Sequence, residues 1–244
     1  MSLQPFKNAK IYLAQYDVSG DFNNVVLQLE TEGLDATTFG QTAGQEAKIE
    51  APGLESVQFS GKVFSQVDAD NPKIDDILKA KLAVSDVPLT VSPLGGAAGD
   101  VAWTFKAMLA SYVPGLQVGQ LPSADLSAKA SGSRLVRGIV LATGVKAAGA
   151  AGTAYQLGAA TAAQRVYGAA HILAISGGGT FTLKVQSDNA VGFPSATDVL
   201  AFTAATAVGS EWKEAAGPIT DDWWRASWTL TAGSVTFAVV VGIL

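Results

Sequence analysis

His171 is the only histidine of the chain, and an imidazole is the side chain most often used as a general base or a metal ligand. It lies in an apolar, strand-like run, GAAHILAI. No second histidine is present to share a metal ion, and the chain has no cysteine, which excludes a Cys-based metal site and a thiol nucleophile. We therefore predict that His171 is a strand residue whose ring is satisfied by hydrogen bonds.

Serine and glycine motifs give no catalytic or nucleotide-binding signature. No serine lies in a Gly-x-Ser-x-Gly context, and a Ser-His-Asp relay, which is a spatial arrangement, would have to use the one histidine. Neither a P-loop nor a Gly-x-Gly-x-x-Gly turn is present, so we expect no cofactor.

Two groups of acidic and amide side chains could in principle serve catalysis or metal binding. Asp221 and Asp222 could serve a β-type hydrolase, but adjacent strand residues point to opposite faces and cannot flank one bond without a turn. Asp188, Asn189 and Asp198 could ligate Ca²⁺, although their spacing matches no known loop, and we interpret them as turn residues. We predict no catalytic residue and no metal site, with a hydrolase as the last-ranked alternative.

Four of the five tryptophans cluster near the end of the chain, at Trp212, Trp223, Trp224 and Trp228. Exposed tryptophan faces could stack on sugars, so an exterior aromatic patch that binds carbohydrate is one hypothesis. Packing is the other, because Trp224 and Trp228 share one face of a strand while Trp223 points to the opposite face.

Composition favours a surface that is buried between subunits. Only 15% of the residues are charged, against roughly 25% in an average globular domain, and the centres of permanent interfaces are depleted of charge. Residues 1–100 carry 14 acidic and 7 basic residues, whereas residues 101–244 carry 7 and 9. An acidic first half disfavours tight binding to nucleic acid.

We expect a soluble protein made in the cytoplasm, because residues 1–10 lack a signal-peptide core and residues 235–244 are too few to span a membrane.

Runs in which apolar and polar residues alternate predict an all-β fold, and the strands of this fold would position the histidine, acidic and tryptophan side chains considered above. The predicted strands of the first half are 9–16, 25–30, 55–67, 89–94, 101–113, 118–130 and 134–142, and those of the second half are 155–157, 169–176, 181–187, 199–203, 223–231 and 234–244. We expect 9–16 to pair with 25–30, and 101–113 to form a long projecting hairpin with 118–130 that turns at Pro114 and Gly115. Residues 31–45 read as a long loop and 143–153 as a linker.

One short helix is predicted before residue 88. Asp70 or Asn71 can cap it, and Pro72 suits its first turn. Apolar residues at helical spacing and charges arranged as the helix dipole favours complete the pattern. These residues are Ile74, Ile77, Leu78, Leu82, Asp75, Asp76, Lys79 and Lys81.

The order of these elements resembles the tail tube fold of long-tailed bacteriophages and related injection machines. The likeness also rests on local sequence, in FKNAKI (6–11), PGLESVQFSG (52–61), AMLASY (107–112), QSDNA (186–190) and GPITDDWWR (217–225). The resemblance implies an all-β, non-enzymatic subunit of the virion tail, with a tail-tube β-barrel or sandwich at 1–145 and a β-sandwich at 146–244 on the tube exterior.

The resemblance also implies partners. Copies of the chain would form stacked, hexameric rings around an acidic lumen through which DNA passes during genome ejection. The tape measure, terminator and distal tail proteins would be further partners, DNA would be only a transient passenger, and no membrane would be involved. A tail terminator or a capsid-tail connector is a closely related role that the sequence leaves open.

Residues are assigned to these roles by alternation and by loop position. We predict that the polar face formed by Ser56, Gln58, Ser60 and Lys62 lines the lumen. We predict that the loop 31–49 and the hairpin turn contact neighbouring subunits, through Thr37, Thr38, Phe39, Gln41, Pro114 and Gly115, and that deleting 37–44 leaves a folded monomer that no longer polymerises. A carbohydrate- or receptor-binding protein of the virion or another surface is the alternative.

Overall fold

The computed structural model describes residues 8–35, 50–65 and 74–244. These residues fold into two antiparallel sheets and the helix α1 (Ile74–Lys81), which confirms the predicted all-β class with one short helix. The larger sheet has, in the described residues, the strands β1 (Lys10–Leu13), β2 (Tyr16–Asp17), β3 (Phe22–Asp35), β4 (Glu50–Phe64), β5 (Val87–Ser92), β6 (Val101–Gly115), β7 (Ser123–Ala130), β8 (Val136–Lys146), β11 (Arg165–Ser176), β14 (Gly209–Ala216) and β16 (Ser234–Ile243). The smaller sheet has β9 (Ala150–Ala151), β10 (Tyr155–Gln156), β12 (Phe181–Asp188), β13 (Thr197–Ala201) and β15 (Trp223–Leu230).

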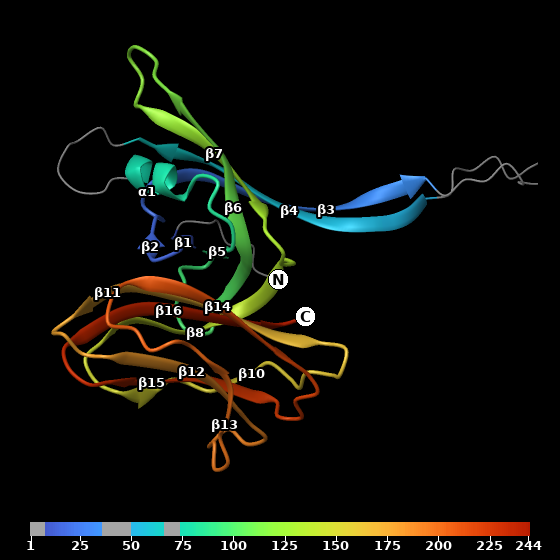
Figure 1. Cartoon of the computed structure of the whole chain (residues 1–244), viewed down its shortest axis with the longest axis vertical. Coiled ribbons are helices and arrows are strands. Elements are labelled where there is room, and N and C mark those ends of the chain that lie inside the picture. Colours follow the sequence, from blue (N-terminus) through green and yellow to red (C-terminus); the bar gives the residue numbers. More distant parts are fainter. Residues whose placement is uncertain (1–7, 36–49, 66–73) are drawn as a thin grey trace, which may run out of the picture.

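The first half of the chain encloses its own hydrophobic core between α1 and the strands β1, β4, β5, β6 and β7. Alternation puts Val57, Phe59 and Val63 of β4 into this core, beside Phe105 and Leu109 of β6. Helix α1 covers one side of the core (Figure 1).

Helix α1 follows the sequence prediction over Ile74–Lys81, whereas Leu82, the last residue of the predicted apolar pattern, lies outside the helix and is 42% exposed. Ile74 and Leu78 are buried, with acidic residues in the first turn and lysines in the last. The predicted capping residues and Pro72 lie outside the described residues. On the first turn, the Asp75 carboxylate accepts hydrogen bonds from the hydroxyls of Tyr112 and Ser65, which tie the helix to β6 and to the end of β4.

The second half is a sandwich in which β8, β11, β14 and β16 face the smaller sheet (Figure 1). Trp224 and Trp228 of β15 lie in the core between the two layers, where Trp228 packs edge-on against Phe237 of β16 at 5.4 Å between ring centroids. Within the larger sheet, β8 and β16 approach closely where a glycine permits it. A Cβ added at Gly138 of β8 would lie 2.1 Å from the carbonyl oxygen of Val241 on the neighbouring strand β16.

The two halves share one continuous sheet. Residues 136–139 of β8 pair with β6, and residues 138–146 of the same strand pair with β16. One hydrophobic cluster holds residues between 11 and 128, and a second holds residues between 141 and 241. The division at 145/146 stays a prediction.

Several sequence predictions of pairing are wrong. Residues 9–16 do not pair with 25–30, because β1 pairs with β2 and β5 while β3 pairs with β4. Thr31 to Asp35 belong to β3 rather than to a loop. The predicted linker 143–153 holds the end of β8 and all of β9, and β14, which pairs with β11, was missed.

Pro114 and Gly115 do not form the turn of the long hairpin. Both belong to β6 and pair with Ala124 and Ser123 of β7. The chain instead turns through residues 116–122, so that β7 has 8 residues where the sequence predicted 13. A proline fits here because it lies near the end of the strand.

Candidate functional site and assembly surfaces

His171 lies fully buried at the contact between β11 and the strands β1 and β5. Its Nδ1 is 2.6 Å from the carbonyl oxygen of Ala14, which can only accept, so Nδ1 carries the proton. In the neutral ring Nε2 then accepts a hydrogen bond from Thr90 Oγ1 at 2.8 Å. Burial lowers the pKa of His171 to about 4. The prediction of a strand residue with a satisfied ring is confirmed.

The acidic residues weighed for chemistry each have a structural partner. Asp188 is buried and accepts backbone N–H bonds from Ala190 and Ser195, which closes the turn after β12. Asp198 pairs with Lys184 at 2.6 Å, and its hydrogen bond to this lysine lowers its pKa. Among the described residues, no group of three or more His, Cys, Asp and Glu side chains is arranged to hold a metal ion.

Asp221 and Asp222 serve different neighbours. The carboxylate of Asp221 accepts a hydrogen bond from Ser187 Oγ at 2.7 Å, and that of Asp222 accepts one from Gln156 Nε2 at 2.6 Å. Both residues precede β15. Asp221 is bonded to β12 on one side of β15 and Asp222 to β10 on the other, so the two carboxylates do not converge on one point.

Of the two hypotheses for the tryptophan cluster, packing is confirmed for Trp224 and Trp228, and an exterior patch is wrong for these two residues. Trp224 has no exposed surface and Trp228 has 6%, and their indole N–H groups donate to the carbonyl oxygens of Gly158 and Ala148. They are buried because the β12–β15 sheet packs on β16. Trp223 is only half-buried, and so is Trp212, whose ring lies 5.8 Å from that of Tyr167.

The polar face of β4 is arranged as its alternation predicted. Ser56, Gln58 and Lys62 are exposed and Ser60 is half-buried, while the residues between them point to the core. The face continues across β7, where Gln58 lies opposite Lys129, Ser60 opposite Ser127 and Lys62 opposite Asp125. Whether this face lines a lumen stays a prediction.

One exposed feature is a two-stranded extension of β3 and β4, which we call the arm and define as residues 29–35 and 50–57. β7 pairs with β4 only at residues 58–64, so the arm extends beyond the rest of the sheet (Figure 1). Leu29, Leu34 and Leu54 on the arm are 54%, 49% and 82% exposed. An isolated two-stranded ribbon is marginally stable in water, so an arm of this kind gains stability from a partner.

A second exposed apolar feature is the turn of the β6–β7 hairpin, which we call the tip and define as residues 116–122. Leu116, Val118 and Leu121 are at least 74% exposed. The sequence indicates an uncharged surface here, because no charged residue occurs between Lys106 and Asp125. Of the predicted inter-subunit residues, Pro114 and Gly115 lie beside the tip, and Thr37, Thr38, Phe39 and Gln41 lie outside the described residues.

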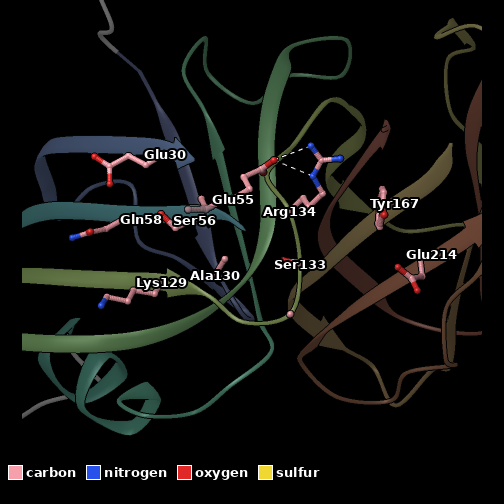
Figure 2. A pocket seen from close by; sticks show the side chains of 12 residues that line it. Glu30, Glu55, Ser56, Gln58, Lys129, Ala130, Ser133, Arg134, Tyr167 and Glu214 are labelled. Atoms are coloured by element: carbon pink, nitrogen blue, oxygen red, sulfur yellow. Dashed lines mark hydrogen bonds and ion pairs between the residues drawn. The ribbon is translucent and has the colours of Figure 1, made fainter. Parts of the chain in front are cut away.

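A polar cleft of about 670 Å³ lies at the root of the arm. Glu30, Gln58 and Lys129 line one side of it, and Tyr167 and Glu214 line the other (Figure 2). Between them, Arg134 donates from Nε and Nη2 to one carboxylate oxygen of Glu55, at 3.0 and 2.8 Å (Figure 2). The Arg134 side chain is 62% exposed, so the pair contributes less than about 1 kcal/mol to stability.

Comparison with known proteins gives no match to a family model and none to a curated protein. Solved structures give partial likenesses. A chain from the virion of a native gene transfer agent particle is 16% identical with a TM-score of 0.41, over 55% of this chain and 97% of that chain. A chain from the sheath/tube terminator of an extracellular contractile injection system is 14% identical with a TM-score of 0.42, over 56% and 97%.

A third likeness spans almost the whole chain. The Dit protein of SPP1, a hub protein of the adsorption apparatus in phages that infect Gram-positive bacteria, is 11% identical with a TM-score of 0.39, over 98% of this chain and 100% of that one. At these scores the likenesses carry no functional inference. In the described residues, no helix has the length and apolarity needed to cross a membrane.

Proposed function

We propose that this chain is a structural subunit of a phage-type tail, and that its copies assemble into stacked, six-membered rings that form the tail tube. Residues 1–145 build the ring wall, and residues 146–244 decorate its exterior. DNA passes through the tube without being held, and other tail proteins contact its ends.

The arm carries this proposal. It extends beyond the core with leucines that are about half or more exposed, and among the described strands its outer strand, β3, pairs with β4 alone. A long exposed strand edge is a ready site for pairing with another chain. The low charge content of the sequence supports the same conclusion, because permanent interfaces are poor in charge.

The polar face of β4 is the proposed lumen lining. Four side chains of β4 point away from the core: Ser56, Gln58, Ser60 and Lys62. If the core forms the wall of a ring, these side chains lie on one surface of that wall, and the proposal takes this surface as the inner one. On and beside this face, Lys62 and Lys129 are balanced in charge by Asp125 of β7 and by Glu30, which lies opposite Ser56 on β3. A hydroxyl- and amide-rich wall without net positive charge would let DNA pass without binding it.

Negative-stain electron microscopy and light scattering of the purified chain, over a range of concentrations, test the proposal. We expect rings or hollow tubes. Leu29→Ser combined with Leu34→Ser should leave a folded monomer, because these side chains are exposed and contribute little to the core. The matched control is Val191→Ser combined with Val208→Ser, which replaces two exposed apolar residues of the second half and should still assemble.

The outcomes separate related roles. A wild-type chain that stays monomeric at every concentration, even with preformed tail tips added as initiator, would contradict the proposal. Rings that never stack into tubes would favour a terminator-like role. Carbohydrate binding by the tryptophan cluster is not proposed, because Trp224 and Trp228 are core residues.

A further inference from the structure

The two halves of the chain meet at a buried polar network, which we call the joint network. His171 of β11 belongs to the second half, and its ring nitrogens contact Ala14, in the turn between β1 and β2, and Thr90 of β5. Thr90 Oγ1 lies 2.9 Å from Thr104 Oγ1, which lies 3.1 Å from the carbonyl oxygen of Leu89. The histidine and both threonines have no exposed surface.

Ala14 fixes one end of the joint network. It is buried and has a φ of 52°, a left-handed conformation that is uncommon outside glycine. Its N–H donates to the carbonyl oxygen of Pro88 at 2.9 Å, and its own carbonyl oxygen lies 2.6 Å from Nδ1 of His171. A carbonyl oxygen can only accept, so Nδ1 carries a proton in the neutral ring and in the charged ring. A further proton therefore adds at Nε2.

In the neutral ring one contact of the joint network lacks a proton. Nε2 accepts the hydroxyl proton of Thr90, which then has none to give to Thr104. The hydroxyl proton of Thr104 can serve either Thr90 Oγ1 or the carbonyl oxygen of Leu89. Three protons, on Nδ1 and on the two hydroxyls, are thus shared among the four contacts of the network.

A proton taken from water at Nε2 serves the remaining contact. Nε2 then donates to Thr90, Thr90 donates to Thr104, and Thr104 donates to the carbonyl oxygen of Leu89. This reversal needs only the rotation of two hydroxyl groups, and every heavy atom keeps its place. Burial still opposes the charge and lowers the pKa of His171. The additional hydrogen bond offsets part of that cost.

Ion pairs leave this titration to the joint network itself. The aromatic ring of Tyr12 stacks on the imidazole, and the sheet partners of the histidine, Ser210 and Ala238, are uncharged. The charged side chains on β11 and on the strands packed against it are paired with one another: Lys10 with Asp17, Lys106 with Asp86, Lys213 with Glu211 and Arg165 with Glu214.

We propose that the joint network is a proton relay, which takes up a proton at His171 by reversing its hydroxyl hydrogen bonds and keeps the two halves docked when the imidazole is charged. Thr104 makes the reversal possible. Without its hydroxyl the neutral ring keeps its bond from Thr90, whereas the charged ring leaves the proton of Thr90 without an acceptor in the network. The inference concerns a single copy and does not depend on the proposed function.

Nitrogen-15 NMR of the chain labelled on histidine tests the relay, because His171 is the only histidine. The two ring-nitrogen signals show where the protons are, and their titration gives the proton affinity. Thr104→Val should weaken that affinity about 2- to 10-fold, which corresponds to one hydrogen bond. Thr104→Ser keeps a hydroxyl and should restore it. The matched control is Ser92→Ala, a buried hydroxyl of β5 that donates to the carbonyl oxygen of Val101 outside the network.

We expect a proton on Nδ1 alone before the titration and on both ring nitrogens after it. A dipolar contact between the rings of His171 and Tyr12 should persist in both states. Loss of this contact as the ring becomes charged would show that the halves separate, and it would overturn the relay. The same proton affinity in the Thr104→Val and natural chains would overturn it as well, and so would a natural chain that unfolds before the ring takes up its proton.

Discussion

The Nε2 atom of His171 lies 2.8 Å from Thr90 Oγ1, and this hydrogen bond joins β11 to β5 at the contact between the two halves. Thr90 Oγ1 in turn lies 2.9 Å from Thr104 Oγ1, and the single hydroxyl proton of Thr104 can be shared between Thr90 Oγ1 and the carbonyl oxygen of Leu89 at 3.1 Å. The ring of His171 also stacks on Tyr12 of β1, at 5.4 Å between centroids. One buried polar network therefore fixes how the halves meet.

The first prediction concerns pH. Burial lowers the pKa of His171 to about 4 in the folded chain, from the ordinary value of 6.5 expected on unfolding. Between pH 4 and pH 6.5 the unfolded state therefore binds more protons than the folded state. The free energy of unfolding is thus highest above pH 6.5, and it falls as the pH drops toward 4. The loss is on the order of 3 kcal/mol. Urea unfolding followed by tryptophan fluorescence at several pH values measures it.

The control for this prediction is His171→Gln, which keeps polar atoms at the site but does not titrate. Carboxylates titrate in the same pH range in both proteins, so the difference between the two pH profiles isolates the histidine. Parallel profiles would show that the imidazole does not carry the effect.

The second prediction is that Thr90→Val lowers the free energy of unfolding by about 1–3 kcal/mol, because the buried Nε2 of His171 loses its hydrogen-bond donor. The shape of the side chain is kept, so packing changes little. Thr229→Val makes the same replacement at an exposed strand position and should stay within about 0.5 kcal/mol of the natural chain. Equal effects at the two positions would be inconsistent with a buried network.

The third prediction separates packing from ligand binding in the tryptophan cluster. Trp224→Ala should cost about 3–5 kcal/mol, because it empties a core site between two sheets and leaves the carbonyl oxygen of Gly158 without its indole donor. Trp212→Ala, at a half-buried site, should cost less than half as much. Thermal unfolding of both variants makes the comparison, and a reversed order would restore Trp224 as an exposed site.

Much of the fold could be predicted from local sequence. Alternation on β4 identified its core face and its polar face, and the charges of α1 identified the helix, because both patterns depend on neighbours along the chain. Strand pairing could not be predicted in the same way. Alternation says that residues 10–13 form a strand, but not that their partner is β5 rather than β3.

The candidate surfaces were only partly predictable for the same reason. The shared face of Trp224 and Trp228 followed from strand geometry, whereas their burial depends on how the β12–β15 sheet packs on β16. At the tip, the Pro114-Gly115 dipeptide pointed to a turn, yet pairing with β7 carries both residues into β6. The arm was missed because nothing local marks where β7 stops covering β4.

The fourth prediction concerns the turn between β15 and β16. Gly233 has a φ of 77°, and a Cβ added there would lie 1.8 Å from the carbonyl oxygen of Ser176. Gly233→Ala should therefore lower the free energy of unfolding by about 1–3 kcal/mol or more. Gly192→Ala is the matched control, because a Cβ there meets nothing within 4 Å. Equal unfolding midpoints in urea for the two variants would contradict the described turn.

The fifth prediction is that the polar face of β4 does not bind DNA. Glu30 and Asp125 balance Lys62 and Lys129 on and beside this face, so no excess of cations is available to displace counterions from phosphates. A gel-shift assay at physiological salt should show no complex with the natural chain. Glu30→Lys combined with Asp125→Lys makes the face strongly positive and should produce a shift that weakens as salt is raised, which shows that the assay detects binding there. A shift with the natural chain that survives physiological salt would mean that this face holds DNA, and a surface of that kind would slow DNA passing through a tube rather than let it through.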